Sequence, residues 1–105
     1  MATVSATSQA MGVSNFASGS FTSDNTATTV KLGFTARWVK VVNTTDVIVW
    51  EKIEGMAAAN SVKTVTAGTT TIDTGSAIVI NADGTITLSS TAVGNSKAIS
   101  WVAVG

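Results

Sequence analysis

Apolar residues recur at every second position along residues 77–81 and 85–89, and this period predicts β-strands with one buried face. The Asp-Gly pair between the two segments is a strong signal for a hairpin turn. We therefore expect an antiparallel hairpin that is half buried and half solvated. The buried side of the two strands carries Ile78 and Ile80, then Ile86 and Leu88.

A second antiparallel pair is predicted from residues 37–43 and 47–54, which are rich in Val, Ile and Trp. The break between them reads Asn-Thr-Thr-Asp, and such residues favour turns because their side chains bond to the neighbouring backbone. Charged residues enter this pair towards its open end. A cross-strand ion pair between Lys40 and Glu51 would set the register and contribute only a few tenths of a kcal/mol.

Both faces of this second pair are apolar near the turn, unlike those of the first hairpin. A strand places successive side chains on opposite faces, which separates Trp38 and Val42 from Val39 and Val41. The following strand separates Ile48 and Trp50 from Val47 and Val49 in the same way. One face can meet another sheet, so the other face needs a loop, the N-terminal segment or another subunit as its cover.

The remaining pattern is also β. Short strands are predicted at 30–34, 62–66, 69–74 and 98–104, and only the segment EGMAAANSV (54–62) could form a turn of helix. Seven to eight short strands spaced about ten residues apart indicate an all-β fold, a small antiparallel sandwich, a jelly-roll-like fold or a barrel.

Residues 1–29 differ from the rest because they are almost wholly Ala, Ser, Thr, Gly and Asn. We expect them to form an extended N-terminal arm or loose strand that becomes ordered by packing, with Phe16 and Phe21 as the anchors of an interface. A flexible N-terminus is the alternative. This division gives an arm over 1–29 and a β-domain over 30–105.

Composition removes several classes of function. The chain has 105 residues and zero net charge, with six basic and six acidic residues and no His or Cys. Nucleic-acid binding needs clustered Lys and Arg, and an anionic membrane surface attracts basic segments, so we expect neither partner. Without Cys there is no disulfide framework and no zinc–thiolate site. The N-terminus lacks the basic start and compact apolar run of a secretory signal, so we expect the protein to be produced in the cytoplasm.

We expect no enzyme, no catalytic residue, no cofactor and no metal site. General acid–base catalysis most often uses His, which is absent. Glu51 and Glu54 are three apart in a predicted strand, so they point to opposite faces and cannot act as a carboxylate pair unless the strand ends between them. The nucleophile-elbow, phosphate-loop and calcium-loop motifs do not occur.

The three tryptophans have two interpretations. Trp38, Trp50 and Trp101 each lie inside an apolar β-run, where Trp usually packs in a core or a subunit interface. A sugar-stacking platform is the alternative. Ser and Thr make up 30 of the 105 residues. That composition is typical of closely packed lattice or fibre proteins and of adhesive modules. The residues expected in core or subunit packing are Trp38, Val39, Val41, Ile48, Trp50 and Trp101.

Three quoted segments carry a resemblance to a known group: GFTARWVKVVNTTDVIVWEKIEGMA, VKTVTAGTTTIDTG and AIVINADGTITLSSTAVGNSKAISWVAVG. Over residues 32–104 the chain resembles small structural proteins of tailed bacteriophages. In that group a Gly-Phe-x-x-Arg-(aromatic)-Val-Lys-Val-Val-Asn segment leads to an aromatic strand ending in Glu-Gly-Met, and a Trp-Val-Ala segment closes the chain.

The resemblance implies a capsid decoration (cement) protein, a virion protein made in the host cytoplasm. Such proteins bind the outside of the major capsid protein lattice as homodimers or homotrimers and stabilise the head. Phe16 and Phe21 would then contact the capsid or a neighbouring copy. The alternative, from another class, is a host-recognition or carbohydrate-binding module of a phage tail or fibre.

Overall fold

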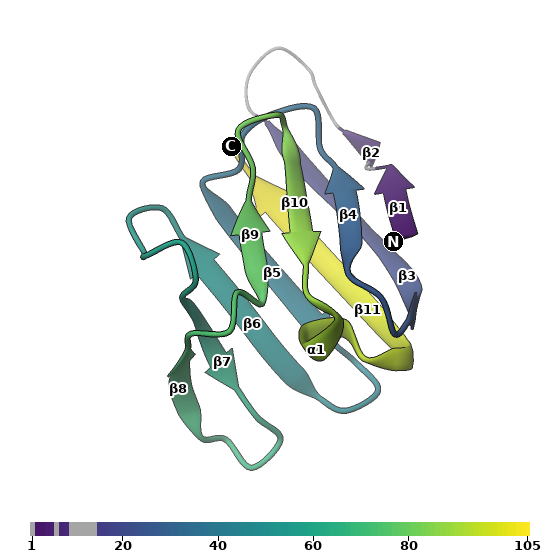
Figure 1. The fold of residues 1–105 in the computed structure, drawn as a ribbon, viewed down its shortest axis with the longest axis vertical. Helices are drawn as coiled ribbons and strands as arrows, with labels where there is room; N and C mark the ends of the chain where they lie inside the picture. The colour runs from purple at the N-terminus through teal and green to yellow at the C-terminus, as the bar shows by residue number, and fades with distance from the viewer. Residues whose placement is uncertain (1, 6, 9–14) are drawn as a thin grey trace.

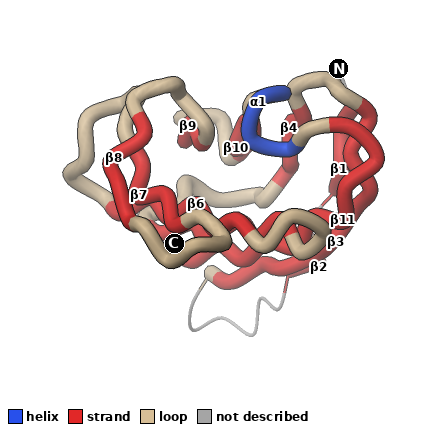
Figure 2. Tube along the Cα trace, turned by 90° about the horizontal axis from the view of Figure 1, so that it is seen from below, coloured by secondary structure: helices blue, strands red, loops and turns tan. Residues whose placement is uncertain are grey.

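Two β-sheets stacked face to face form the fold in the computed structural model, as Figures 1 and 2 show. The backbone is described for residues 2–5, 7–8 and 15–105, and side chains are described from residue 15 onward. The smaller sheet has the strand order β1-β4-β10-β9. Its strands are β1 (Ala2–Ser5), β4 (Thr28–Lys31), β10 (Thr85–Leu88) and β9 (Ile78–Ile80). Strand β1 is parallel to β4, and the other pairs are antiparallel.

The larger sheet is antiparallel throughout and has the order β2-β3-β11-β5-β6-β7-β8. Strand β11 lies inside this sheet, between β3 and β5, although it comes last in the chain. The strands are β2 (Thr7–Ser8), β3 (Phe16–Asp24), β5 (Trp38–Asn43), β6 (Ile48–Ile53), β7 (Ser61–Thr64), β8 (Thr70–Asp73) and β11 (Asn95–Val104). Figure 1 shows the β7–β8 hairpin extending beyond the smaller sheet.

The all-β sandwich expected from the sequence is confirmed, and a barrel is not formed because both sheets are open. All eight strands expected after residue 29 are present, as β4 to β11. The described residues hold eleven strands rather than seven or eight, because the segment before residue 29 adds β1, β2 and β3.

The turns form as their residues predict. Asp83 accepts a hydrogen bond from the backbone N–H of Thr85, and Gly84 takes a φ of 84° that favours glycine. In the β5–β6 turn, the Asn43 side chain accepts from the backbone N–H of Asp46. Both hairpins therefore lie where the sequence predicts them.

The single helix in the described residues, α1 (Ser90–Val93), was not expected. The Ser89 hydroxyl caps it by accepting from the backbone N–H of Ala92. Residues 54–62, the expected helical turn, instead form turns that lead into β7. Gly55 has a φ of 98° there, which no α-helix allows.

The core lies between the two sheets and follows the alternation. Val39 and Val41 point inward from β5, and Ile99, Trp101 and Ala103 do so from β11. The smaller sheet contributes Val30, Ile78, Ile86 and Leu88 to the same core, and all four are fully or almost fully buried. Lys40 and Glu51 lie on the opposite side of the larger sheet, away from this core.

Candidate functional site

The side of the larger sheet that faces away from the smaller one carries a group of apolar side chains from neighbouring strands. No described strand or helix lies over it (Figure 2). We call it the outer face. Its central residues are Trp38, Lys40 and Val42 from β5, Val49, Glu51 and Ile53 from β6, Val62 from β7, and Val102 and Val104 from β11.

The outer face is accessible rather than sealed. Ile53 is 49% exposed, and Trp38, Val42, Val49 and Val102 are half-buried. Two shallow hollows open along it. One, of about 210 Å³, is lined by Lys40, Val42, Ser100, Trp101 and Val102. The other, of about 390 Å³, is lined by Arg37, Trp38, Ile53, Glu54, Val104 and Gly105. A partner side chain of ordinary size therefore has places to enter.

Few charges interrupt this face. Lys40 and Glu51 are directly opposite in the β5–β6 register. They do not form an ion pair, and the Glu51 carboxylate accepts a hydrogen bond from the Trp38 indole N–H at 3.1 Å. At the end of the face, Arg37 and Glu54 form a two-point ion pair with N–O distances of 3.1 Å. Both of these side chains are mostly exposed, so this pair contributes little stability.

The two phenylalanines expected at an interface lie on opposite sides of β3. They are five residues apart, and an odd spacing along a strand reverses the side-chain direction. Phe16 lies in the same row as Val104 and Trp38 and is 37% exposed. Phe21 instead points inward and is partly buried against the core. Of the two, Phe16 is the more exposed and the one that lies on the outer face.

The residues expected in core or subunit packing also separate into two groups. Val39 and Val41 are buried in the core together with Trp50 and Trp101, which are only 3% and 4% exposed. Ile48 is half-buried and packs against the same core. Trp38 lies on the outer face, so it is the only tryptophan with an accessible ring, and no group of three tryptophans forms a platform.

Trp50 is the centre of a small polar cluster at the β7–β8 end of the core. Its indole N–H donates to Asp73 at 3.2 Å, and the Lys63 ammonium lies 5.4 Å from its ring centroid. The backbone N–H of Gly75 donates to Asp73 at 2.7 Å and lowers the pKa of that carboxyl, an effect that burial opposes and that Trp50 and Lys63 reinforce. The cluster orders the end of the sheet that the smaller sheet leaves uncovered.

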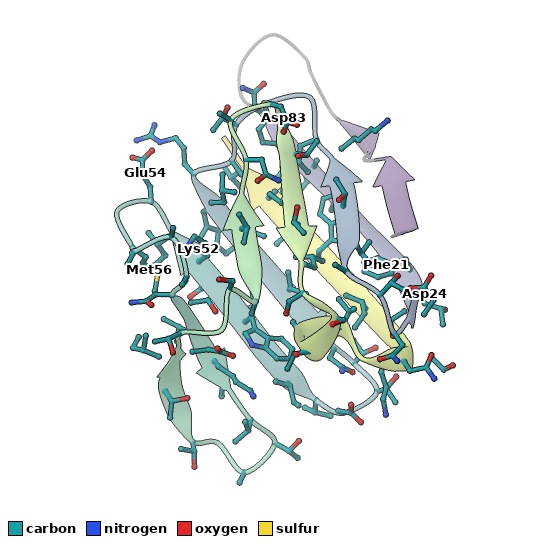
Figure 3. All side chains as sticks on the ribbon, viewed as in Figure 1. Phe21, Asp24, Lys52, Glu54, Met56 and Asp83 are labelled. Atoms are coloured by element: carbon teal, nitrogen blue, oxygen red, sulfur yellow. The ribbon has the colours of Figure 1, made fainter. Side chains whose placement is uncertain are left out.

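Lys52 is a buried cation that sequence reasoning did not identify. It points inward from β6, beside the loop that carries Met56, and is 5% exposed (Figure 3). Its ammonium donates to three backbone carbonyls, those of Ala57 at 2.9 Å, Ala58 at 3.1 Å and Asn60 at 2.8 Å. Burial lowers the pKa of this lysine. The only available signal was its alternation with Trp50, which places both side chains on the inner face.

The six carboxylates are dispersed over the fold and each accepts a local hydrogen bond. Asp46, for example, forms an ion pair with Lys97 at 3.2 Å and accepts from the Asn43 amide. The other donors are Thr26 to Asp24, Trp38 to Glu51, Arg37 to Glu54, Gly75 to Asp73 and Thr85 to Asp83. No three acidic side chains gather into a group that could hold a metal ion in the described part of the chain.

Searches of protein-family models, of curated proteins and of solved structures give no match to this chain. Within the residues that the structure describes, no helix has the length and apolar character needed to cross a membrane. The outer face is therefore the feature from which a function has to be inferred.

Proposed function

We propose that this chain is a structural protein of a virion, a capsid decoration (cement) protein that binds protein surfaces of the assembly through its outer face. The observation that carries the proposal is the apolar outer face itself, which has one lysine and one glutamate at its centre and no described cover. Monomeric proteins rarely leave so broad an apolar surface exposed unless it meets a partner.

The sequence resemblance over residues 32–104 supplies the kind of assembly. A lattice repeats the same site many times, so a modest contact at each site produces strong attachment when several copies are linked to one another. In this proposal the major capsid protein is the surface that is stabilised. The high content of Ser and Thr keeps the remaining strand faces wettable without adding charge.

The proposal is tested by the copy number of the protein in purified particles of the virus that encodes it, measured by quantitative mass spectrometry against the major capsid protein. We expect a copy number comparable with that of the major capsid protein. A few copies per particle would indicate the tail or fibre alternative instead, and absence from the particle would refute a virion role.

A rebinding experiment tests the outer face itself. Purified protein is added to particles that lack it, and the bound amount is measured after sedimentation. Ile53→Asp places a charge on the outer face opposite Trp38, and we expect binding at least about tenfold weaker because a buried unpaired charge is costly. Val47→Asp is the matched control: Val47 is 58% exposed but lies in the β5–β6 turn. Equal binding by both variants would rule out the outer face as the contact.

A further inference from the structure

The pairing register gives the outer face an unusual internal order. Reading across β11, β5, β6 and β7, the central row is Val102, Lys40, Glu51 and Val62. The next row towards the turn is Ser100, Val42, Val49 and Thr64. A line drawn between β5 and β6 therefore divides each of these two rows into matching halves. The first row has opposite charges next to the line and a valine on each outer side. The second row has a valine on each side of the line and a hydroxyl on each outer side.

A twofold axis along that line would bring complementary side chains of two copies together. The axis would lie midway between the two outer faces and run parallel to the strands, which places β5 of one copy over β6 of the other. Lys40 then meets the second copy's Glu51, and this contact occurs twice. By the same rotation Val42 meets Val49, Val102 meets Val62, and Ser100 meets Thr64 of the second copy.

The charges are available for this contact. In the part of the chain that the structure describes, Lys40 makes no ion pair, although Glu51 is its direct neighbour in the register. Glu51 accepts one hydrogen bond, from Trp38, and a carboxylate can accept several. The Arg37–Glu54 pair is satisfied within one copy. One free cation and one partly free anion thus lie side by side at the centre of the face.

We propose that the outer face is the interface of a twofold homodimer in which Lys40 of each copy pairs with Glu51 of the other. This inference rests on the proposed function and narrows it: the protein surface that the outer face binds is a second copy, and the dimer attaches to the major capsid protein through other surfaces. Ile53→Asp then weakens binding to particles because it separates copies that are otherwise linked. Two sheets that pack face to face cross at about 30°, so the strands of the two copies diverge away from the level at which they cross. The residues of the two copies match best at that level, which we place at the charged row.

The larger sheet offers an extended surface for a dimer. The molecule extends 40 × 28 × 21 Å, and the two sheets stack along the shortest axis (Figure 2), so the larger sheet spans much of the two longer dimensions (Figure 1). A specific interface of standard size buries about 800 Å² on each partner. The valines of the central rows on β11, β5, β6 and β7 suit the core of a homodimer interface.

Charge reversal tests the geometry by sedimentation equilibrium. We expect the wild-type protein to form dimers. Lys40→Glu and Glu51→Lys should each weaken dimerisation at least about 100-fold, tenfold for each of the two like-charge contacts that the symmetry creates. An equimolar mixture of the two variants should recover dimers, because every contact in the mixed dimer again joins opposite charges. Lys31→Glu, on the exposed side of β4, is the matched control and should dimerise as the wild type does.

Several outcomes would overturn the dimer. The first is a wild type that stays monomeric up to about 1 mM, which corresponds to a binding free energy of only about 4 kcal/mol. The second is charge-reversed variants that dimerise as the wild type does. The third is a mixture of folded variants that stays monomeric. Circular dichroism establishes folding. If a variant does not fold, carbodiimide coupling of a mixture of ¹⁵N-labelled and unlabelled wild type replaces it. A Lys40–Glu51 cross-link that joins a labelled to an unlabelled peptide in the dimer band supports the interface, and a dimer band without such a mixed cross-link refutes the interface. A monomeric protein found at high copy number in particles would leave the proposed function intact. A dimer absent from particles would refute that function alone.

Discussion

Lys52 should be the residue whose loss most clearly exposes how the loop after β6 is held. Lys52→Met keeps the length and most of the apolar stem but removes the ammonium that bonds the carbonyls of Ala57, Ala58 and Asn60. Hydrogen bonds to a charged group contribute about 1.5–3 kcal/mol each in favourable cases. Ala57 and Ala58 are exposed, however, so water can reach their carbonyls in the variant.

We therefore expect Lys52→Met to lower the free energy of unfolding by about 2 kcal/mol, less than the sum of three buried bonds. That corresponds to a fall in Tm of about 10 °C for a domain of this size. Urea unfolding followed by circular dichroism measures the change. Lys31→Met is the control, because Lys31 is exposed on β4 and its loss should change stability by less than about 0.5 kcal/mol.

The pH dependence gives a second measurement. Burial lowers the pKa of Lys52 in the folded state, so the folded protein binds fewer protons than the unfolded chain between that lowered pKa and the ordinary value of 10.5. The contribution of this group to stability therefore rises with pH in that window, and the Met variant should lack the rise. A Met variant as stable as the wild type, with the same pH profile, would refute the role assigned to the ammonium.

Three further predictions concern Gly19, the two phenylalanines of β3, and Asp73. Gly19→Ala should lower the free energy of unfolding by about 1–3 kcal/mol, because the added Cβ would lie 2.9 Å from the buried Trp101 ring. Urea unfolding measures the change with Ser18→Ala as the control, and an unchanged midpoint would contradict the close approach. Phe21→Ala should destabilise by about 2 kcal/mol and Phe16→Ala by less than about 1 kcal/mol, since only Phe21 packs on the core; the reverse order of Tm values would contradict the placement of β3. Asp73→Asn should lower stability slightly at pH 7, and this difference should shrink as pH falls from 3.8 through the lowered pKa of Asp73 in the folded state, because the stabilising ionisation is lost over that window. A difference that does not shrink in acid would show that the amide fails for another reason.

The sequence was sufficient for the elements that depend on alternation and turn residues. Residues 77–89 show a period of two, so that hairpin and its inner face could be predicted from the alternation and the Asp-Gly turn. The hairpin over residues 37–54 could be predicted from its two apolar runs and its Asn-Thr-Thr-Asp turn, but not which of its two apolar faces is the inner one. Strand β3 was less clear because its inner face carries Ala17, Gly19 and Ser23. Small residues are required there, since the large Trp101 ring from β11 lies over Gly19, and that neighbour is 82 positions away in the chain.

The site was only half predictable for a related reason. Two apolar faces on residues 37–54 already indicated that one of them needs a partner. Which strands flank that pair depends on long-range pairing, and so does the row that joins Val102, Lys40, Glu51 and Val62. A single helical turn such as α1 and a buried cation such as Lys52 leave almost no periodic signal. Both depend on where the rest of the chain places a cap or a group of carbonyls.

The position of β11 has a consequence for biosynthesis. Strands β3 and β5 both pair with residues 95–104, which leave the ribosome after every other strand of the sandwich. Until then the larger sheet consists of two separate groups, β2-β3 and β5-β6-β7-β8, and β3 and β5 each have an unpaired edge. Unpaired edges and exposed apolar residues are surfaces that aggregate or bind chaperones. Arrest of translation before residue 95 thus leaves a polypeptide without the strand that joins β3 to β5, so the larger sheet stays in two parts.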